Sequence, residues 1–180
     1  MKKLLFLVTF CAIFFVSCDR TLSIEEVENN INEHYNNLQT LELNASAFTS
    51  ISNKTQAYEF DFCYNAYDID TITIISPEEI AGITASIEKD TDSMQIAFEN
   101  MQIETLMAEN LGISPVDVTS FAIFDLKNKS AESISVSDVI KISYLDGEIS
   151  KDIYLKLETY DIMKVEVYVN NQMVIYCNYS

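Results

Sequence analysis

The stretch IISPEEIAGIT (residues 74–84) decides how the chain folds, because it can begin either a helix or a corner between two strands. Ser76 could cap a helix, Pro77 could occupy its first turn, and Glu79 stands where a capping-box partner would. Strand-like sequence flanks the stretch on both sides, however, and Gly82 arrives before a second helical turn is complete. An isolated helix that short is unstable in water. The stretch therefore predicts a corner between two strands, with one capped turn inside it.

The second Ile-Ser-Pro triplet (residues 113–115) continues differently. Ser114, Pro115 and Asp117 are typical of a helix start, and apolar residues then recur at helical spacing. We expect a helix over residues 115–127. An earlier helix is predicted from residue 24, because Ser23 and Glu26 form a capping box. Its apolar stripe consists of Ile24, Val27, Ile31, Tyr35 and Leu38.

The remaining apolar residues alternate with polar ones, which predicts strands with one buried face. Before the second helix these runs cover residues 41–47, 58–65, 71–75, 83–88 and 94–105, the last interrupted at Asn100. After it they cover residues 139–144, 152–158, 163–169 and 173–179. The pair Asn170-Asn171 predicts a two-residue hairpin turn, since asparagine tolerates positive φ. In that register Val167 faces Val174, and Val165 faces Tyr176.

This order of elements predicts an α+β, mainly β protein. Four or five strands, a helix and four more strands form a meander that is best accommodated by one large curved antiparallel sheet. The N-terminal and central helices would then lie on the concave face. Residues 23–180 contain no repeat or linker and are expected to form a single domain.

The N-terminus predicts a bacterial lipoprotein signal in residues 1–17. Lys2 and Lys3 precede an apolar core from Leu4 to Val16, which is too short to span a membrane. Ser17-Cys18 then resembles a lipobox, cut before the cysteine, whose thiol receives a diacylglycerol. Residues 18–22 would be a lipidated tether that holds the protein on the extracytoplasmic side of the cell membrane. The alternative is an ordinary secretory signal with an incidental cysteine.

The charge of the chain excludes one class of partner. Removal of Lys2 and Lys3 with the signal lowers the formal net charge from −17 to −19. Binding of nucleic acid through its phosphates is therefore not expected. Anionic lipid headgroups would also be repelled, so the acyl anchor and not surface charge would hold the protein to the membrane.

Two cysteines remain in the mature chain beside Cys18. Cys63 and Cys177 lie in strand-like runs and could form a disulfide outside the cytoplasm. The alternative, which we prefer, is two small, partly buried side chains.

No pattern in the sequence predicts an enzyme, a cofactor or a metal site. The single histidine, His34, is expected to be a solvated helix residue, because it has no second histidine or paired cysteine beside it. The acidic pairs Asp90/Asp92 and Glu78/Glu79 could in principle serve a glycosidase, but 28 acidic residues produce such pairs by chance.

Three segments, taken in order, resemble the LolA-like lipoprotein carriers and their lipoprotein relatives in Gram-positive bacteria, GerS-like germination lipoproteins among them. They are residues 74–84, residues 92–105 followed by 112–118, and residues 163–179. The resemblance implies an open β half-barrel plugged by helices. One departure is that soluble carriers of the family hold a lid with an arginine on an early strand, whereas this chain has no arginine after Arg20.

The resemblance implies an apolar concave surface that accepts acyl chains or lipidated cargo. A second possibility is an envelope or spore protein that docks to and regulates a cell-wall amidase. The side chains available for such a surface are Tyr58, Phe60, Phe62, Ile72, Ile74, Met94, Ile96, Phe98, Met101, Val165 and Val167. The alternative is that they are ordinary core beneath the helix at 115–127.

Overall fold

The computed structural model describes residues 23–51, 54–88, 93–98, 101–107 and 112–180. The predicted signal, the tether with Cys18, and the Asp90/Asp92 pair lie outside the described residues. Within the described ranges, two α-helices and one 3₁₀ turn accompany eleven strands. Before the second helix these are α2 (Ile24–Asn36), β1 (Thr40–Ile51), β2 (Lys54–Asn65), β3 (Asp70–Ser76), η1 (Glu78–Ile80), β4 (Ile83–Glu88), β5 (Ser93–Phe98) and β6 (Met101–Met107). The rest are α3 (Val118–Asn128), β7 (Ser133–Val136), β8 (Val139–Asp146), β9 (Ile149–Lys156), β10 (Ile162–Val169) and β11 (Gln172–Tyr179).

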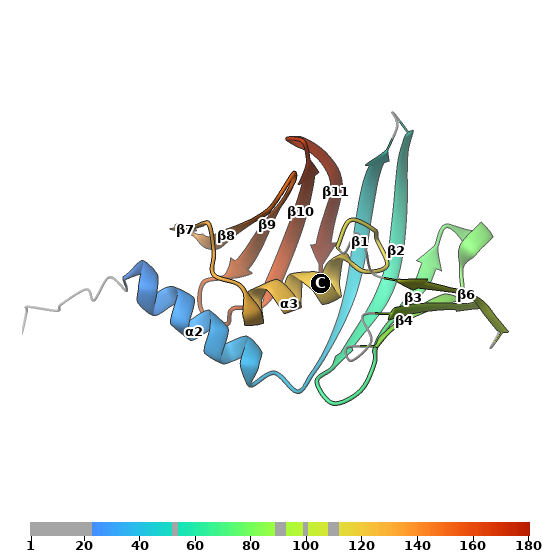
Figure 1. Cartoon of the computed structure of the whole chain (residues 1–180), viewed down its shortest axis with the longest axis horizontal. Helices are drawn as coiled ribbons and strands as arrows, with labels where there is room; N and C mark the ends of the chain where they lie inside the picture. The colour runs from blue at the N-terminus through green and yellow to red at the C-terminus, as the bar shows by residue number, and fades with distance from the viewer. Residues whose placement is uncertain (1–22, 52–53, 89–92, 99–100, 108–111) are drawn as a thin grey trace, which may run out of the picture.

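All eleven strands form one antiparallel sheet. Its order is β6-β5-β4-β3-β2-β1-β11-β10-β9-β8-β7, so every neighbour is also a sequence neighbour except at the β1–β11 junction. Two meanders therefore meet at the middle of the sheet. Figure 1 shows α2 and α3 on one face of this curved sheet, on the side of β7–β11, while β3–β6 extend away from them. The expected open antiparallel half-barrel with an N-terminal and a central helix is confirmed.

Helix α2 begins where the sequence predicts. The Ser23 hydroxyl accepts from the Glu26 backbone N–H at 3.1 Å, and the Glu26 carboxylate accepts from the Ser23 N–H at 2.9 Å. This capping box satisfies two of the free donors at the helix start. The apolar stripe then buries Val27, Ile31 and Tyr35 against the rest of the core.

The two Ile-Ser-Pro triplets behave differently, as predicted, although both predictions need a correction. Residues 74–84 form a corner between β3 and β4, and the N–H of Gly82, at φ +86°, donates to the Ile74 carbonyl at 2.8 Å. The turn η1 has no side-chain cap, so the predicted capping role is wrong. In the second triplet, Ser114 and Pro115 lie in a loop. Helix α3 begins at Val118, three residues later than predicted, but the predicted start signal does form: the Asp117 carboxylate accepts from the Ser114 N–H at 2.9 Å, and the Ser114 hydroxyl accepts from the Val116 N–H at 3.3 Å.

The C-terminal hairpin has the predicted turn and a different register. Asn170 and Asn171 both have positive φ, at 51° and 62°, as a two-residue turn of this type requires. A bulge between Val167 and Tyr168 shifts the pairing by one residue, so Val167 pairs with Ile175, and Val165 pairs with Cys177. The apolar ladder therefore forms one position further along β11 than predicted.

Candidate functional site

Most of the apolar side chains predicted to line a cavity belong to the core. Six of them are at most 3% exposed and lie on the face of the sheet covered by the helices: Phe60, Phe62, Ile72, Ile74, Val165 and Val167. They have no free surface on which to hold a ligand. For these six residues, the structure favours the alternative interpretation, ordinary core.

The exposure of this face rises toward the edge strand β6. Two sets of paired residues show this. Phe60 on β2 pairs with Ile74 on β3. Further toward the edge, Ile83 on β4 pairs with Phe98 on β5, which pairs in turn with Met101 on β6. Phe60 and Ile74 are 1% and 3% exposed, Ile83 is half-buried, and Phe98 and Met101 are 36% and 64% exposed. Among the described residues, the helices α2 and α3 lie toward β7–β11 and the central strands (Figure 1), and neither of them covers β4–β6, although Ala85 and Ile87 on the same face of β4 are buried.

We call this region the apolar strip. It consists of Ile83, Met94, Ile96, Phe98 and Met101 on β4–β6. Four of these were predicted, and Ile83 was missed as a lining residue. The remaining predicted residue, Tyr58, is half-buried on β2 and packs against the core. Within the strip, Phe98 and Met101 are the exposed residues, whereas Ile83 and Met94 are partly buried against the core.

A buried ion pair fixes α3 to the concave face on the other half of the sheet, at β9. The Lys151 ammonium on β9 lies 2.8 Å from Oδ2 of Asp125 on α3, and the two side chains are 8% and 1% exposed. Lys129 lies 2.9 Å from the other Asp125 oxygen, but its side chain is 36% exposed. Sequence reasoning missed this pair. The available signal was Lys151 itself, which occupies an inward position in the alternation with Ile153 and Leu155.

The loop before α3 closes over the same lysine. A Cβ on Gly112 would lie 2.6 Å from the Lys151 Nζ, so only glycine fits there, and its φ of +80° also favours glycine. Asp117 is buried at the end of this loop and accepts from the Ser114 N–H at 2.9 Å. Burial raises the pKa of the Asp117 carboxyl to about 6, although backbone hydrogen bonds from Ser114 and Gly112 and the Lys151 charge oppose the shift.

Two further polar contacts connect α3 to the sheet. The hydroxyls of Thr119 and Tyr179 are 3.0 Å apart, and the Lys127 ammonium donates to the Tyr64 hydroxyl at 2.9 Å. Burial raises the pKa of the Tyr179 phenol well above its usual value. Through Tyr64, Tyr179 and Lys151, the helix is held at β2, β11 and β9, so it covers the middle of the sheet as a fixed plug.

The two cysteines do not form the disulfide considered above. Both are free thiols: Cys177 is buried on the concave face, whereas Cys63 is half-buried among the outward side chains of β2. Burial raises the pKa of the Cys177 thiol to about 12. The preferred interpretation, two small side chains with a packing role, agrees with these positions.

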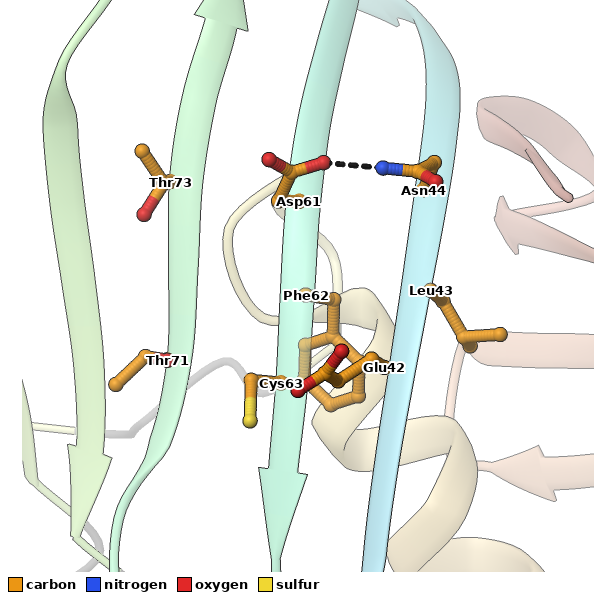
Figure 2. Close-up of a pocket in the computed structure, with 8 residues that line it drawn as sticks. All are labelled: Glu42, Leu43, Asn44, Asp61, Phe62, Cys63, Thr71 and Thr73. Carbon is orange, nitrogen blue, oxygen red and sulfur yellow. Dashed lines mark hydrogen bonds between the residues drawn. The ribbon is translucent and has the colours of Figure 1, made fainter.

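A second hollow lies on the opposite face of the sheet. It has a volume of about 420 Å³, and its outward lining consists of Glu42, Asn44, Asp61, Cys63, Thr71 and Thr73 on β1–β3. Figure 2 shows the amide of Asn44 hydrogen-bonded to Asp61, with Phe62 behind the β2 ribbon. Glu42 and Asp61 are its only acidic lining residues, and no metal-binding cluster of histidine, cysteine and acidic residues occurs among the described residues.

Comparison with known proteins gives a likeness in architecture. No protein-family model matches the sequence, and no curated protein is significantly similar to it. Among solved structures, a LolA superfamily protein from Nitrosomonas europaea matches with a TM-score of 0.46 and 8% identity, over 89% of this chain and 92% of that one. The complex of the CwlD amidase with the GerS lipoprotein from Clostridioides difficile matches with a TM-score of 0.46 and 15% identity, over 87% of this chain and 92% of that one.

A DUF1329 family protein from Desulfovibrio piger matches with a TM-score of 0.48 and 7% identity, over 86% of this chain and 90% of that one. The expected similarity to LolA-like proteins and to GerS is thus confirmed for the structure. At these identities it concerns the architecture and not an activity. Within the described residues, no helix has both the length and the apolar composition needed to cross a membrane.

Proposed function

We propose that the protein is an extracytoplasmic lipoprotein, held at the membrane through Cys18, that binds acyl chains on its apolar strip. The observation that supports this proposal is the exposure of Phe98 and Met101 at the open end of an apolar face whose other end is packed core. An acyl chain laid along the strip would gain about 0.8 kcal/mol for each methylene removed from water. The ion-paired plug leaves the strip accessible without any movement of α3.

The strip can be tested with two substitutions on one strand. Ile96→Asp places a charge on the strip, whereas Ala97→Asp places the same charge on the other face of β5. We expect Ile96→Asp to abolish binding of a fluorescent fatty acid and Ala97→Asp to retain it. Native mass spectrometry after mild extraction should also detect lipid on the wild-type protein and the Ala97→Asp variant. Equal affinity in the two variants, or a wild-type protein free of lipid, would contradict acyl binding.

The anchor is tested separately. Cys18→Ala removes the thiol that would carry the diacylglycerol, so the protein should move from the membrane fraction into the medium or periplasm. Immunoblotting of the two fractions measures this directly. Continued membrane retention of the variant would refute the anchor and leave the acyl-binding result unaffected.

A second function, docking to a cell-wall hydrolase such as an amidase, is favoured by the 64% exposure of Met101. A methionine at the rim of an apolar surface is well suited to a protein interface, because its flexible side chain adapts to a partner. A crosslinker placed at residue 101 should then capture a wall hydrolase in envelope or spore extracts. Recovery of lipid without any hydrolase would exclude docking as the main function.

A further inference from the structure

A groove lies between one flank of α2 and the turn that connects β9 to β10. Its volume is about 530 Å³, and its lining consists of Asn30, Glu33, His34, Asn37, Leu38 and Tyr160. The first five are Asn30 and the residues three, four, seven and eight positions after it, so they share one flank of α2 and the residues just after its end. Apart from Leu38, which ends the apolar stripe and packs against the core, these residues lie outside the buried stripe of the helix, and the groove is separate from the apolar strip.

Tyr160 forms the second wall of the groove in an unfavourable backbone conformation. Its φ is +60°, a region that glycine and asparagine adopt more readily than a large aromatic residue. The surroundings hold it there: the buried Tyr35 hydroxyl donates to the Tyr160 carbonyl at 2.6 Å, and the Tyr160 N–H donates to the Lys156 carbonyl at 3.0 Å. Both bonds use backbone atoms, so they would form with any residue at 160. The turn itself therefore does not require a tyrosine.

The side chain of Tyr160 instead contributes an aromatic surface to the groove. Its hydroxyl accepts a long hydrogen bond of 3.4 Å from the Asn30 amide, and its ring lies 5.9 Å from the His34 ring in an edge-to-face arrangement. Strained residues that the fold holds in place are concentrated at binding sites. Tyr160 is half-buried and packs in part against the core, and the rest of its ring forms the aromatic wall of the groove.

The rest of the groove presents free polar groups. Within the described part of the chain, the Glu33 carboxylate and the Asn37 amide form no side-chain hydrogen bond, and both are exposed. Together they offer one anionic acceptor and one amide that both donates and accepts. His34 adds a ring with two nitrogens at the side of the groove.

These groups define the chemistry of a ligand. An anion is disfavoured by Glu33, by Asp161 next to His34, and by a formal net charge of −17. An acyl chain is disfavoured because only Leu38 of the six lining residues is aliphatic. A neutral ligand that has a ring with one apolar face could place that face against the Tyr160 ring. Hydroxyl and amide groups on the same ligand could then form hydrogen bonds with the asparagine side chains of the groove. We propose that this groove binds a neutral, acetamido-bearing sugar of the N-acetylhexosamine class.

The test is an NMR titration of the ¹⁵N-labelled protein with triacetylchitotriose. Saturable shifts are expected for the amides of residues 30–38 and 160, with a Kd of about 1 mM. Tyr160→Asn keeps both backbone hydrogen bonds and relieves the strain, which offsets the core contacts that the ring loses, so its thermal midpoint should stay close to that of the wild type. The same variant loses the aromatic wall, and its affinity for the sugar should fall by about tenfold.

A matched pair of variants keeps the proposal testable if Tyr160→Asn fails to fold. Asn37→Ala removes a groove amide and should weaken binding about fivefold, whereas Asn36→Ala, one residue earlier and outside the groove, should leave the affinity unchanged. The absence of saturable shifts would overturn the proposal, and so would equal affinities in Asn37→Ala and Asn36→Ala. The proposal would also be overturned if the amide signals of residues 30–38 and 160 shifted on addition of an oligolysine peptide but not on addition of the sugar. That result would assign the groove to a basic peptide.

Discussion

Replacing Lys151 by methionine should destabilise the protein more than any change at the exposed lysine beside it. The substitution removes the ammonium that lies 2.8 Å from Asp125, and leaves a carboxylate that is 1% exposed with Lys129 as its remaining partner. Breaking a buried pair by removing one member costs about 3–5 kcal/mol, because the other charge stays buried without compensation. Lys129 is 36% exposed, so water screens its contact, and we expect Lys151→Met to cost about 3 kcal/mol.

The assay is urea unfolding of the mature protein followed by far-ultraviolet circular dichroism, since the chain has no tryptophan. Lys129→Ala serves as the control and should cost no more than about 1 kcal/mol. In the double variant Lys151→Met/Asp125→Leu both charges are gone, and stability should return to within about 1 kcal/mol of the wild type. If the double variant lost as much free energy of unfolding as the two single variants lose together, the buried charge would not be the cause. The loss of stability would then come from packing and not from an unpaired charge.

Two further predictions concern the loop before α3. Asp117 has a folded-state pKa of about 6 against a usual 3.8, so its stabilising contribution is present below about pH 3.8 and is lost as the pH rises through about 6. Asp117→Asn should therefore be up to about 3 kcal/mol more stable than the wild type at pH 7 and less dependent on pH between 4 and 7, as measured by urea unfolding at each pH; an unchanged pH profile would exclude Asp117 as its source. Gly112→Ala should lower the free energy of unfolding by about 1–3 kcal/mol, because the new Cβ would collide with the Lys151 Nζ. Thermal unfolding should show a smaller effect of Gly112→Ala in a Lys151→Met background than in the wild type.

The architecture could be predicted from the sequence wherever a local signal and the fold agree. The capping box at Ser23, the corner at residues 74–84 and the turn at Asn170-Asn171 are each determined by the conformations their own residues prefer. The predictions that needed correction depend on long-range contacts. The bulge after Val167 cannot be derived from β10 and β11 alone, and β7 was not predicted, because its alternation of serine with Ile134 and Val136 extends over only four residues.

The candidate site was predicted less completely, for a physical reason. Alternation identifies which residues face the concave side, but it does not say where the helices stop covering that side. Phe60 and Phe98 carry the same pattern signal, yet one is 1% and the other 36% exposed. Lys151 could have been recognised as an inward charge, but its partner Asp125 lies on a different element.

The sheet combines two regions with different roles in stability. On the side of β7–β11 and at the central strands, α2 and α3 bury a continuous core, and the Lys151–Asp125 pair fixes the position of α3 over it. The β4–β6 side gains less from burial, because its apolar residues become progressively exposed toward the edge. Cooperative stability therefore comes mainly from the covered side, and this allows the uncovered side to present an apolar surface to water without unfolding the protein. This arrangement suits a binding surface, because a ligand on the apolar strip would remove from water the apolar side chains that α2 and α3 do not cover.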